Sequence, residues 1–163
     1  MPEGERPRFP SVYGIRDDEE GLLDWSWAAE RLASSRNYWV ATTRPDGSPH
    51  AMPVWGLWHD DAFYFSSSPD SRKARNIASN PNVVVHLESG DEVVIVEGSA
   101  ELVTDAELLQ RLGEDYTTKY EFEVSFTSGR GLTAVHPRVA YAWREESFPA
   151  TATRFEFATE ASP

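Results

Sequence analysis

The sequence predicts a mainly β protein in which short strands form an antiparallel sheet that closes into a barrel, with short helices beside it. Three observations lead to this prediction. About seven segments are rich in β-branched and aromatic residues, tight turns separate several of them, and few helical segments lie between them. Short strands joined by turns favour an antiparallel barrel over a parallel sheet.

The predicted strands are bounded by turn-forming residues. They cover residues 37–43, 50–58, 62–67, 82–88, 92–103, 132–143 and 151–157. The sequence Arg44-Pro45-Asp46-Gly47 predicts a hairpin turn, because proline presets one dihedral angle and glycine accepts a positive φ. Pro53 cannot donate a hydrogen bond to a neighbouring strand, so the second strand is expected to lie at an edge or to contain a bulge.

Three segments have helical spacing or helix-start signals. The predicted helices cover residues 22–35, 69–79 and 105–119. The second helix is stopped by Asn80-Pro81. The third begins at a predicted capping box, in which the side chains of Thr104 and Glu107 satisfy free backbone amides. Residues 121–131 are predicted to form a loop.

The length of 163 residues suits one domain, and 40% hydrophobic residues suffice for a core. We expect an N-terminal arm over residues 1–20, a barrel domain over residues 21–158 and a C-terminal tail over residues 159–163. The arm contains several prolines and ends in four acidic residues. It is interpreted either as a flexible tail or as an arm that packs on a partner subunit.

Composition excludes several classes of partner and chemistry. Lysine and arginine number 15 against 27 aspartate and glutamate residues, so the net charge is −12 and the protein repels nucleic acid and anionic lipid. Cysteine is absent, which excludes disulfides, thiolate metal sites and a cysteine nucleophile. The first residues lack an apolar signal segment, and no apolar run approaches the roughly 20 residues that span a bilayer, so we expect a cytoplasmic protein.

The strongest candidate site lies where the third predicted strand meets the second helix. Three hydroxyl residues end the strand and three basic residues begin the helix: Ser66, Ser67 and Ser68, then Arg72, Lys73 and Arg75. Helix N-termini present free N–H groups and a partial positive charge, which suit a phosphate. This local reversal of charge on an acidic chain indicates a phosphate site. A capped helix with solvated basic residues is the structural alternative.

A second candidate is the proline-interrupted strand Met52-Pro53-Val54-Trp55-Gly56. Its backbone amides and carbonyls are left unpaired by neighbouring strands, which suits a flat heterocycle with amide-like edges. Trp55 or Trp58 is a candidate to cover such a ring. A bulged barrel strand with tryptophans in the core is the structural alternative.

Other polar residues give weaker signals. The four histidines lack the close spacing of metal ligands and have no cysteine to complete a ligand set, so no metal site is predicted. They are His50, His59, His86 and His136. Glu97 and Glu101 alternate onto one face of a predicted strand and are interpreted as a solvated stripe rather than paired catalytic acids.

Several of these segments together resemble a known family. They are Trp39–His50, Pro53–Trp55, Ser71–Ile77, Asn80–Pro81, Glu97–Ala100, Trp143–Glu146 and Thr153–Phe157. In order and spacing, over about residues 25–157, they resemble the pyridoxamine 5'-phosphate oxidase-like FMN-binding split-barrel family. The resemblance implies a six-stranded split β-barrel that forms a homodimer, with two cofactor sites at the subunit interface.

The resemblance also implies roles for individual residues. In that family, strand-end hydroxyls and helix basic residues bind the cofactor phosphate, the ring lies along the proline-containing strand, and late strands of the partner close the site. The matching residues are Ser66, Ser67, Ser68, Arg72 and Lys73 with Asn76 nearby, then Met52, Pro53, Val54 and Trp55, and finally Trp143.

The pattern is most similar to the branch that uses FMN or coenzyme F-420, an 8-hydroxy-5-deazaflavin. This implies an oxidoreductase that transfers a hydride between the bound cofactor and an unsaturated or quinone-like small molecule. No catalytic residue is assigned. An FMN- or deazaflavin-binding protein for storage or sensing, and a haem-binding split-barrel relative, are the alternatives. The acidic tail of the deazaflavin would need further basic residues, for which Arg36, Arg44 and Arg75 are candidates.

The sequence differs from true pyridoxamine phosphate oxidases near its C-terminal end. Those enzymes carry an arginine-rich substrate motif there, whereas residues 157–163 contain no arginine. Oxidation of vitamin B6 is therefore not expected.

Overall fold

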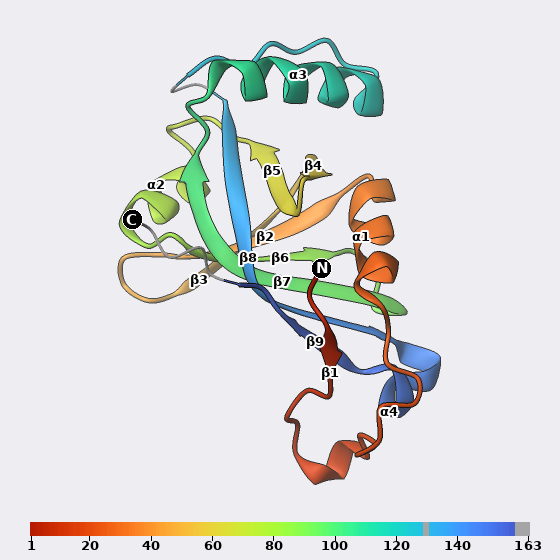
Figure 1. Ribbon diagram of the computed structural model, residues 1–163. Coiled ribbons are helices and arrows are strands. Elements are labelled where there is room, and N and C mark those ends of the chain that lie inside the picture. The colour runs from red at the N-terminus through yellow and green to blue at the C-terminus, as the bar shows by residue number, and fades with distance from the viewer. Residues whose placement is uncertain (129–130, 159–163) are drawn as a thin grey trace.

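The computed structural model describes residues 1–128 and 131–158, which form one antiparallel sheet with short helices around it (Figure 1). The strands are β1 (Gly4–Glu5), β2 (Tyr38–Thr43), β3 (Pro49–Val54), β4 (Gly56–His59), β5 (Ala62–Ser66), β6 (Asn82–Leu87), β7 (Glu92–Leu102), β8 (Leu132–Arg144) and β9 (Thr153–Glu156). The predicted tail over residues 159–163, and residues 129 and 130 of the predicted loop, lie outside the described residues.

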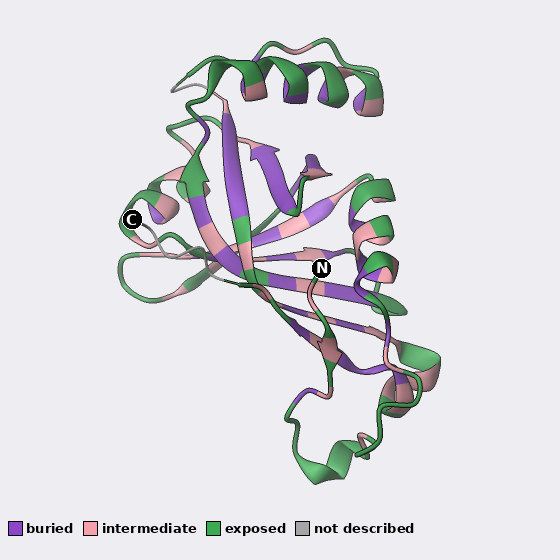
Figure 2. Ribbon diagram, in the orientation of Figure 1, coloured by how far each residue is buried: buried purple, intermediate pink, exposed green. Residues whose placement is uncertain are grey.

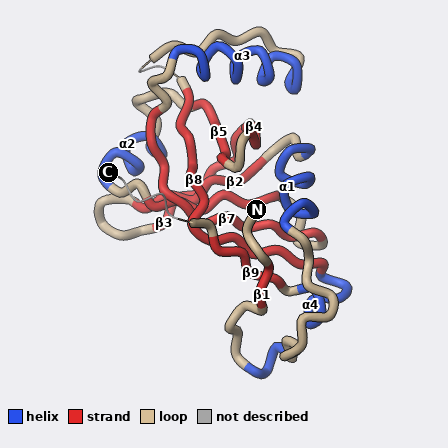
Figure 3. The backbone as a smooth tube through the Cα atoms, in the orientation of Figure 1, coloured by secondary structure: helices blue, strands red, loops and turns tan. Residues whose placement is uncertain are grey.

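The helices are α1 (Trp25–Ser34), α2 (Arg72–Ser79), α3 (Ala106–Tyr120) and α4 (Phe148–Thr151), with short 3₁₀ turns at Ser11–Tyr13 and Glu145–Ser147. Figure 3 shows the helices at the periphery of the strands. The mainly β, antiparallel fold predicted from the sequence is confirmed. Among the described helices, none has the length and apolar character needed to cross a bilayer.

The barrel has six strands when β3 and β4 are counted as one bent strand. Its order is β6, β2, β3 and β4, β5, β8 and β7, with each neighbouring pair antiparallel. The single strand expected over residues 50–58 is divided at Trp55: β3 pairs with β2, and β4 pairs with β5. The ring of backbone hydrogen bonds is therefore open here, and Pro53 lies on an edge strand as predicted.

The split in the barrel occurs along β8. The first part of β8 pairs with β5 up to Val135, and the last part pairs with β9 from Val139 onward. Pro137 lies between these parts and has no N–H to donate, and the register with β7 shifts at Glu97/Gly98. The two halves of the sheet therefore diverge at this point.

Two groups of buried residues form the core. Figure 2 shows buried positions, in purple, along most of the central strands. The larger group fills the barrel and includes the fully buried Val40, Phe63, Phe65, Val85, Val94 and Val96. Fully burying a side chain of this kind contributes about 1.5–3 kcal/mol. The second group joins α3 to β4, β5 and the start of β8, through residues such as Leu57, Leu109, Leu112 and Leu132. This second group holds α3 across one end of the barrel.

The helix starts differ slightly from the predicted ones. The side chain of Ser71 accepts a hydrogen bond from the Ala74 amide, so α2 begins at Arg72 rather than at residue 69. Asp105, not Thr104, caps α3 by accepting from the Leu108 amide at 2.7 Å. Ser71 and Asp105 are both good caps; the predicted start of α2 was three residues too early and that of α3 one residue too early.

The N-terminal residues pack against the C-terminal strand of the same chain. Gly4 pairs with Phe155, and the Arg6 guanidinium donates to the carbonyl oxygens of Asp18 and Glu20, each at 2.7 Å. Arg6 also donates to Ala150 O at 2.6 Å. These contacts differ from the flexible tail considered from the sequence, and packing of residues 1–20 on a partner stays a prediction.

Candidate functional site

The candidate phosphate site lies at the start of α2, where β5 ends. Ser66 is the last residue of β5 and pairs with Leu132. The chain then turns, with the Ser71 amide donating to Ser68 O at 2.9 Å. Ser66 and Ser67 are half-buried, and Ser68 is exposed at the turn. The hydroxyls expected from the sequence therefore lie beside the free amides of the α2 N-terminus.

Positive charges from two separate elements meet at this point. His50 of β3 lies close enough to Arg44, Lys73 and Arg72 for their charges, after burial, to lower its pKa. The β2–β3 hairpin therefore faces the first turn of α2. The Nδ1 atom of His50 is buried and has no hydrogen-bond partner in the part of the chain that the structure describes.

These cations are not neutralised by the acidic residues that dominate the chain. Within residues 1–128 and 131–158, no ion pair joins Arg44, Arg72 or Lys73 to a carboxylate. Arg72 is exposed, whereas Lys73 is half-buried and its pKa is lowered by that burial. Asp46 lies near Arg44, but its carboxylate binds the Ser48 amide and hydroxyl. The cluster is thus available to an external anion.

Asn76 lies beneath this cluster rather than on its surface. Its side chain is fully buried, and its Nδ2 atom donates to Thr42 Oγ1 at 2.9 Å. Its Oδ1 atom has no hydrogen-bond partner among the described residues. Asn76 therefore fixes α2 to β2, and a direct contact with a cofactor stays a prediction.

The predicted ring-binding segment continues from the basic cluster along β3. His50 and Met52 are two residues apart on this strand, so their side chains share one face. Met52 and Pro53 are exposed, and Val54 is buried. Because β3 pairs only with β2 among the described strands, the backbone groups on its other edge are free for another partner.

Trp55 and Trp143 occupy different surroundings. Trp55 stacks on Tyr120, with ring centroids 4.5 Å apart and an angle of 9° between the planes. Trp143 packs edge-on against Phe148 near the far end of β8. It is eleven residues beyond Leu132, the partner of Ser66, or about 35 Å along an extended strand. A single chain therefore does not bring Trp143 to the other predicted site residues.

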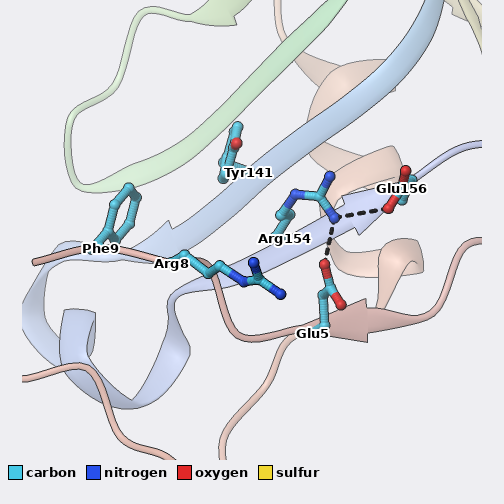
Figure 4. Close-up of a pocket in the computed structure, with 6 residues that line it drawn as sticks. All are labelled: Glu5, Arg8, Phe9, Tyr141, Arg154 and Glu156. Carbon is cyan, nitrogen blue, oxygen red and sulfur yellow. Dashed lines mark hydrogen bonds and ion pairs between the residues drawn. The ribbon is translucent and has the colours of Figure 1, made fainter.

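A cavity of about 410 Å³ lies apart from the start of α2, between the N-terminal residues and the last two strands (Figure 4). Arg154 in this cavity forms ion pairs with Glu5 and with Glu156. Hydrogen bonds from Arg154 to Glu156 and Glu5 raise its pKa further. Because its charge is already matched by two carboxylates, this cavity is a poorer anion site than the start of α2.

Sequence reasoning missed His50 and assigned Arg44 only to a cofactor tail. The hairpin turn at residues 44–47 was the available signal, since it brings Arg44 and the start of the returning strand together. The contact of that hairpin with α2 depends on tertiary packing. Ser71 was also missed, although a serine directly before a helical segment is a recognised cap.

The fold and the site together define a split β-barrel with a cationic cluster suited to an anionic group. The chain belongs to the pyridoxamine 5'-phosphate oxidase family, whose sequence model matches residues 27–144. The predicted resemblance is confirmed, and it places the chain in a family of flavin-related oxidoreductases.

Individual relatives support this membership. A pyridoxine/pyridoxamine 5'-phosphate oxidase from Sphingopyxis alaskensis is 37% identical over 108 residues, which is 61% of this chain. The matched region is half of that enzyme's length. A conserved hypothetical protein from Mycobacterium tuberculosis has a TM-score of 0.68 at 26% identity, over 80% of this chain and 90% of its own. A structure named F420 reductase has a TM-score of 0.54 at 24% identity. The match covers 68% of this chain and 94% of that one, and it shows a shared fold.

Proposed function

We propose that this protein is an oxidoreductase that uses FMN or coenzyme F-420 to transfer a hydride to or from an unsaturated or quinone-like small molecule. The observation that carries the proposal is the cluster of Arg44, Arg72 and Lys73 around His50, where the β2–β3 hairpin faces the start of α2. None of these three cations forms an ion pair with a carboxylate of the described residues. On a chain with a net charge of −12, such a cluster favours the binding of an anion at this place.

The residues of this cluster fit a phosphate group in three ways. The Ser71 side chain already accepts from the Ala74 amide, and the amides of Arg72 and Lys73, which have no partner among the described residues, remain to donate to phosphate oxygens. Arg72 and Lys73 supply charge-assisted hydrogen bonds. Ser66, Ser67 and Ser68 add hydroxyl groups at the preceding strand end. Together these groups anchor one end of the cofactor.

The ring is proposed to lie along Met52, Pro53, Val54 and Trp55, where the free edge of β3 offers backbone groups to its polar edge. When bound, the ring supplies the hydride chemistry, and the protein orients it and excludes water. The chain is proposed to form a homodimer in which the partner subunit brings Trp143 to the site. This arrangement accounts for the distance between Trp143 and α2 within one chain.

The choice between FMN and coenzyme F-420 depends on basic residues beyond the phosphate. Arg75 is exposed on α2 and suits the acidic tail of the deazaflavin. Arg36 lies over the ring of Trp55 at 5.4 Å, so it belongs to the opposite end of the candidate site. The F420 reductase supports the deazaflavin only through a shared fold.

Titration of the purified protein with FMN, coenzyme F-420 and haem tests the proposal. Lys73→Ala should weaken binding of FMN and F-420 by about one to two powers of ten, since a charged hydrogen bond is worth about 1.5–3 kcal/mol. Arg111→Ala is the matched control, because Arg111 is an exposed cation on α3. Arg75→Ala should weaken F-420 alone.

Equal affinity of Lys73→Ala and wild-type protein for both cofactors would refute the phosphate site. Saturable uptake of haem alone would favour the haem-binding alternative. If a bound cofactor were neither reduced by physiological donors nor reoxidised by a broad panel of acceptors, storage or sensing would replace catalysis as the function.

A further inference from the structure

The end of α3 covers the free edge of β4 at the break in the barrel. The Gly56 amide donates to the Tyr120 hydroxyl at 2.8 Å, and Lys119 Nζ donates to Gly56 O at 3.0 Å. Both backbone groups of Gly56 are therefore bound by side chains from consecutive residues of α3. These side chains take the place of a neighbouring strand at this edge.

The same two side chains also bind two further backbone carbonyls and the Tyr38 hydroxyl. The Tyr120 hydroxyl donates to Arg36 O at 2.7 Å. Lys119 Nζ donates to the Tyr38 hydroxyl at 2.7 Å and to Ala33 O at 3.2 Å. The Tyr38 hydroxyl in turn lies 2.8 Å from Ser35 O. The end of α1, the start of β2 and the start of β4 thus meet at one point.

No carboxylate of residues 1–128 or 131–158 forms an ion pair with Lys119. Its ammonium group has three donors, and three acceptors surround it. The other ionisable groups that face it are Tyr38 and Tyr120. Tyr116 packs behind Tyr120, and Arg36 lies over the Tyr120 ring at 5.6 Å. Asp115, one turn earlier on α3, lies 3.9 Å from His59 instead. Burial lowers the pKa of Lys119 to about 8.

The backbone at Gly56 is closely packed and has little room to move. A Cβ atom there would overlap the Phe63 ring and stand 2.8 Å from Tyr64 O. Trp55, directly before it, is stacked on the Tyr120 ring. The bend between β3 and β4 is therefore fixed by the barrel on one side and by α3 on the other.

We propose that Lys119 and Tyr120 are positioning residues that hold the segment Met52–Trp55 in place and so set the environment of the cofactor ring. They act separately from the residues at the start of α2 that are proposed to bind the phosphate. The inference rests on the proposed function, because the ring is assigned to that segment there. The Met52–Trp55 segment is covalently joined to Gly56, and its last residue is stacked on Tyr120. A change at Tyr120 is therefore transmitted to the ring end of the site and not to α2.

The test compares Tyr120→Phe and Lys119→Met with Tyr116→Phe. Tyr116 is the matched control, because it lies one turn earlier on α3 and packs against Tyr120, at 4.7 Å between centroids, without bonding Gly56. Tyr120→Phe keeps the ring that stacks on Trp55 and removes only the hydroxyl. Lys119→Arg serves as the conservative rescue, since it keeps donors and charge.

Two readouts are required. In cofactor-free protein, amide exchange at Gly56 should accelerate about threefold to tenfold in Tyr120→Phe, the effect of losing one hydrogen bond. In FMN-loaded protein, the visible absorption maximum and the midpoint potential of the flavin should shift in Tyr120→Phe and Lys119→Met. The dissociation constant of FMN should change by less than about threefold, since the phosphate contacts are untouched. Tyr116→Phe should match wild type, and Lys119→Arg should restore most of the shift.

An unchanged flavin spectrum and potential in both variants would overturn the inference while leaving the proposed function intact. Slow, unchanged exchange at Gly56 in Tyr120→Phe would also overturn it. Failure of wild-type protein to bind FMN or F-420 would instead refute the proposed function, and the exchange measurement would still test the contact with Gly56.

Discussion

Replacing Thr42 with valine tests the contact that fixes α2 to the barrel. Thr42 is 3% exposed and its hydroxyl accepts from the fully buried Asn76. Valine has nearly the same shape, so the change creates no cavity but leaves the Asn76 amide without its partner. An unsatisfied buried donor costs about 1–3 kcal/mol. For a domain of this size, each kcal/mol lowers the melting temperature by about 2–4 °C, which gives a drop of about 2–12 °C.

Thermal unfolding followed by circular dichroism measures this drop. Thr43→Val is the matched control, because Thr43 is the next residue of β2 and points to the other, less buried face. It should change stability by less than about 0.5 kcal/mol. The double variant Thr42→Val/Asn76→Leu should recover much of the loss, since both polar partners are removed together. A melting temperature of Thr42→Val within 1 °C of wild type, on the order of experimental error, would refute the reasoning.

Three further predictions concern other parts of the fold. Gly56→Ala should destabilise the protein by more than about 2 kcal/mol in urea unfolding, because the added methyl group overlaps the Phe63 ring; an unchanged midpoint would contradict this. Arg6→Met should release residues 1–20, measured as faster proteolysis there with little change in the global midpoint, since Arg6 binds four backbone carbonyls. Between about pH 8 and 10.5, Lys119 is neutral in the folded protein and charged in the unfolded chain, so the unfolded state binds more protons and the free energy of unfolding should rise with pH relative to Lys119→Met. Melting temperatures of both proteins at about pH 7 and 9.5 measure this; an equal difference between the two proteins at both pH values would exclude the lowered pKa.

Most strands and helices could be predicted, because their signals are local. The alternation of β2 and the hairpin turn after it depend only on neighbouring residues, and so does the helical spacing of α1. Strand β1 could not be predicted, since Gly4–Glu5 has no periodic pattern and forms only against β9.

Part of the candidate site could be predicted, again because its signals are local in the sequence. Arg72 and Lys73 follow a strand end in the sequence, so their place beside the α2 N-terminus was accessible. The break at Trp55 depends on Tyr120, which is far along the chain, and it was read as one continuous strand. The place of His50 depends on the packing of a hairpin against a helix. Such tertiary contacts have no signature within a short window of sequence.

The pairing of β1 with β9 joins residues from the two ends of the described chain, with Gly4 opposite Phe155. During synthesis the N-terminal residues leave the ribosome long before their partner strand exists. Contacts between such distant residues are costly in loop-closure entropy and form late. We therefore expect the barrel strands to assemble first, with residues 1–20 closing over the C-terminal strand as the final step of maturation.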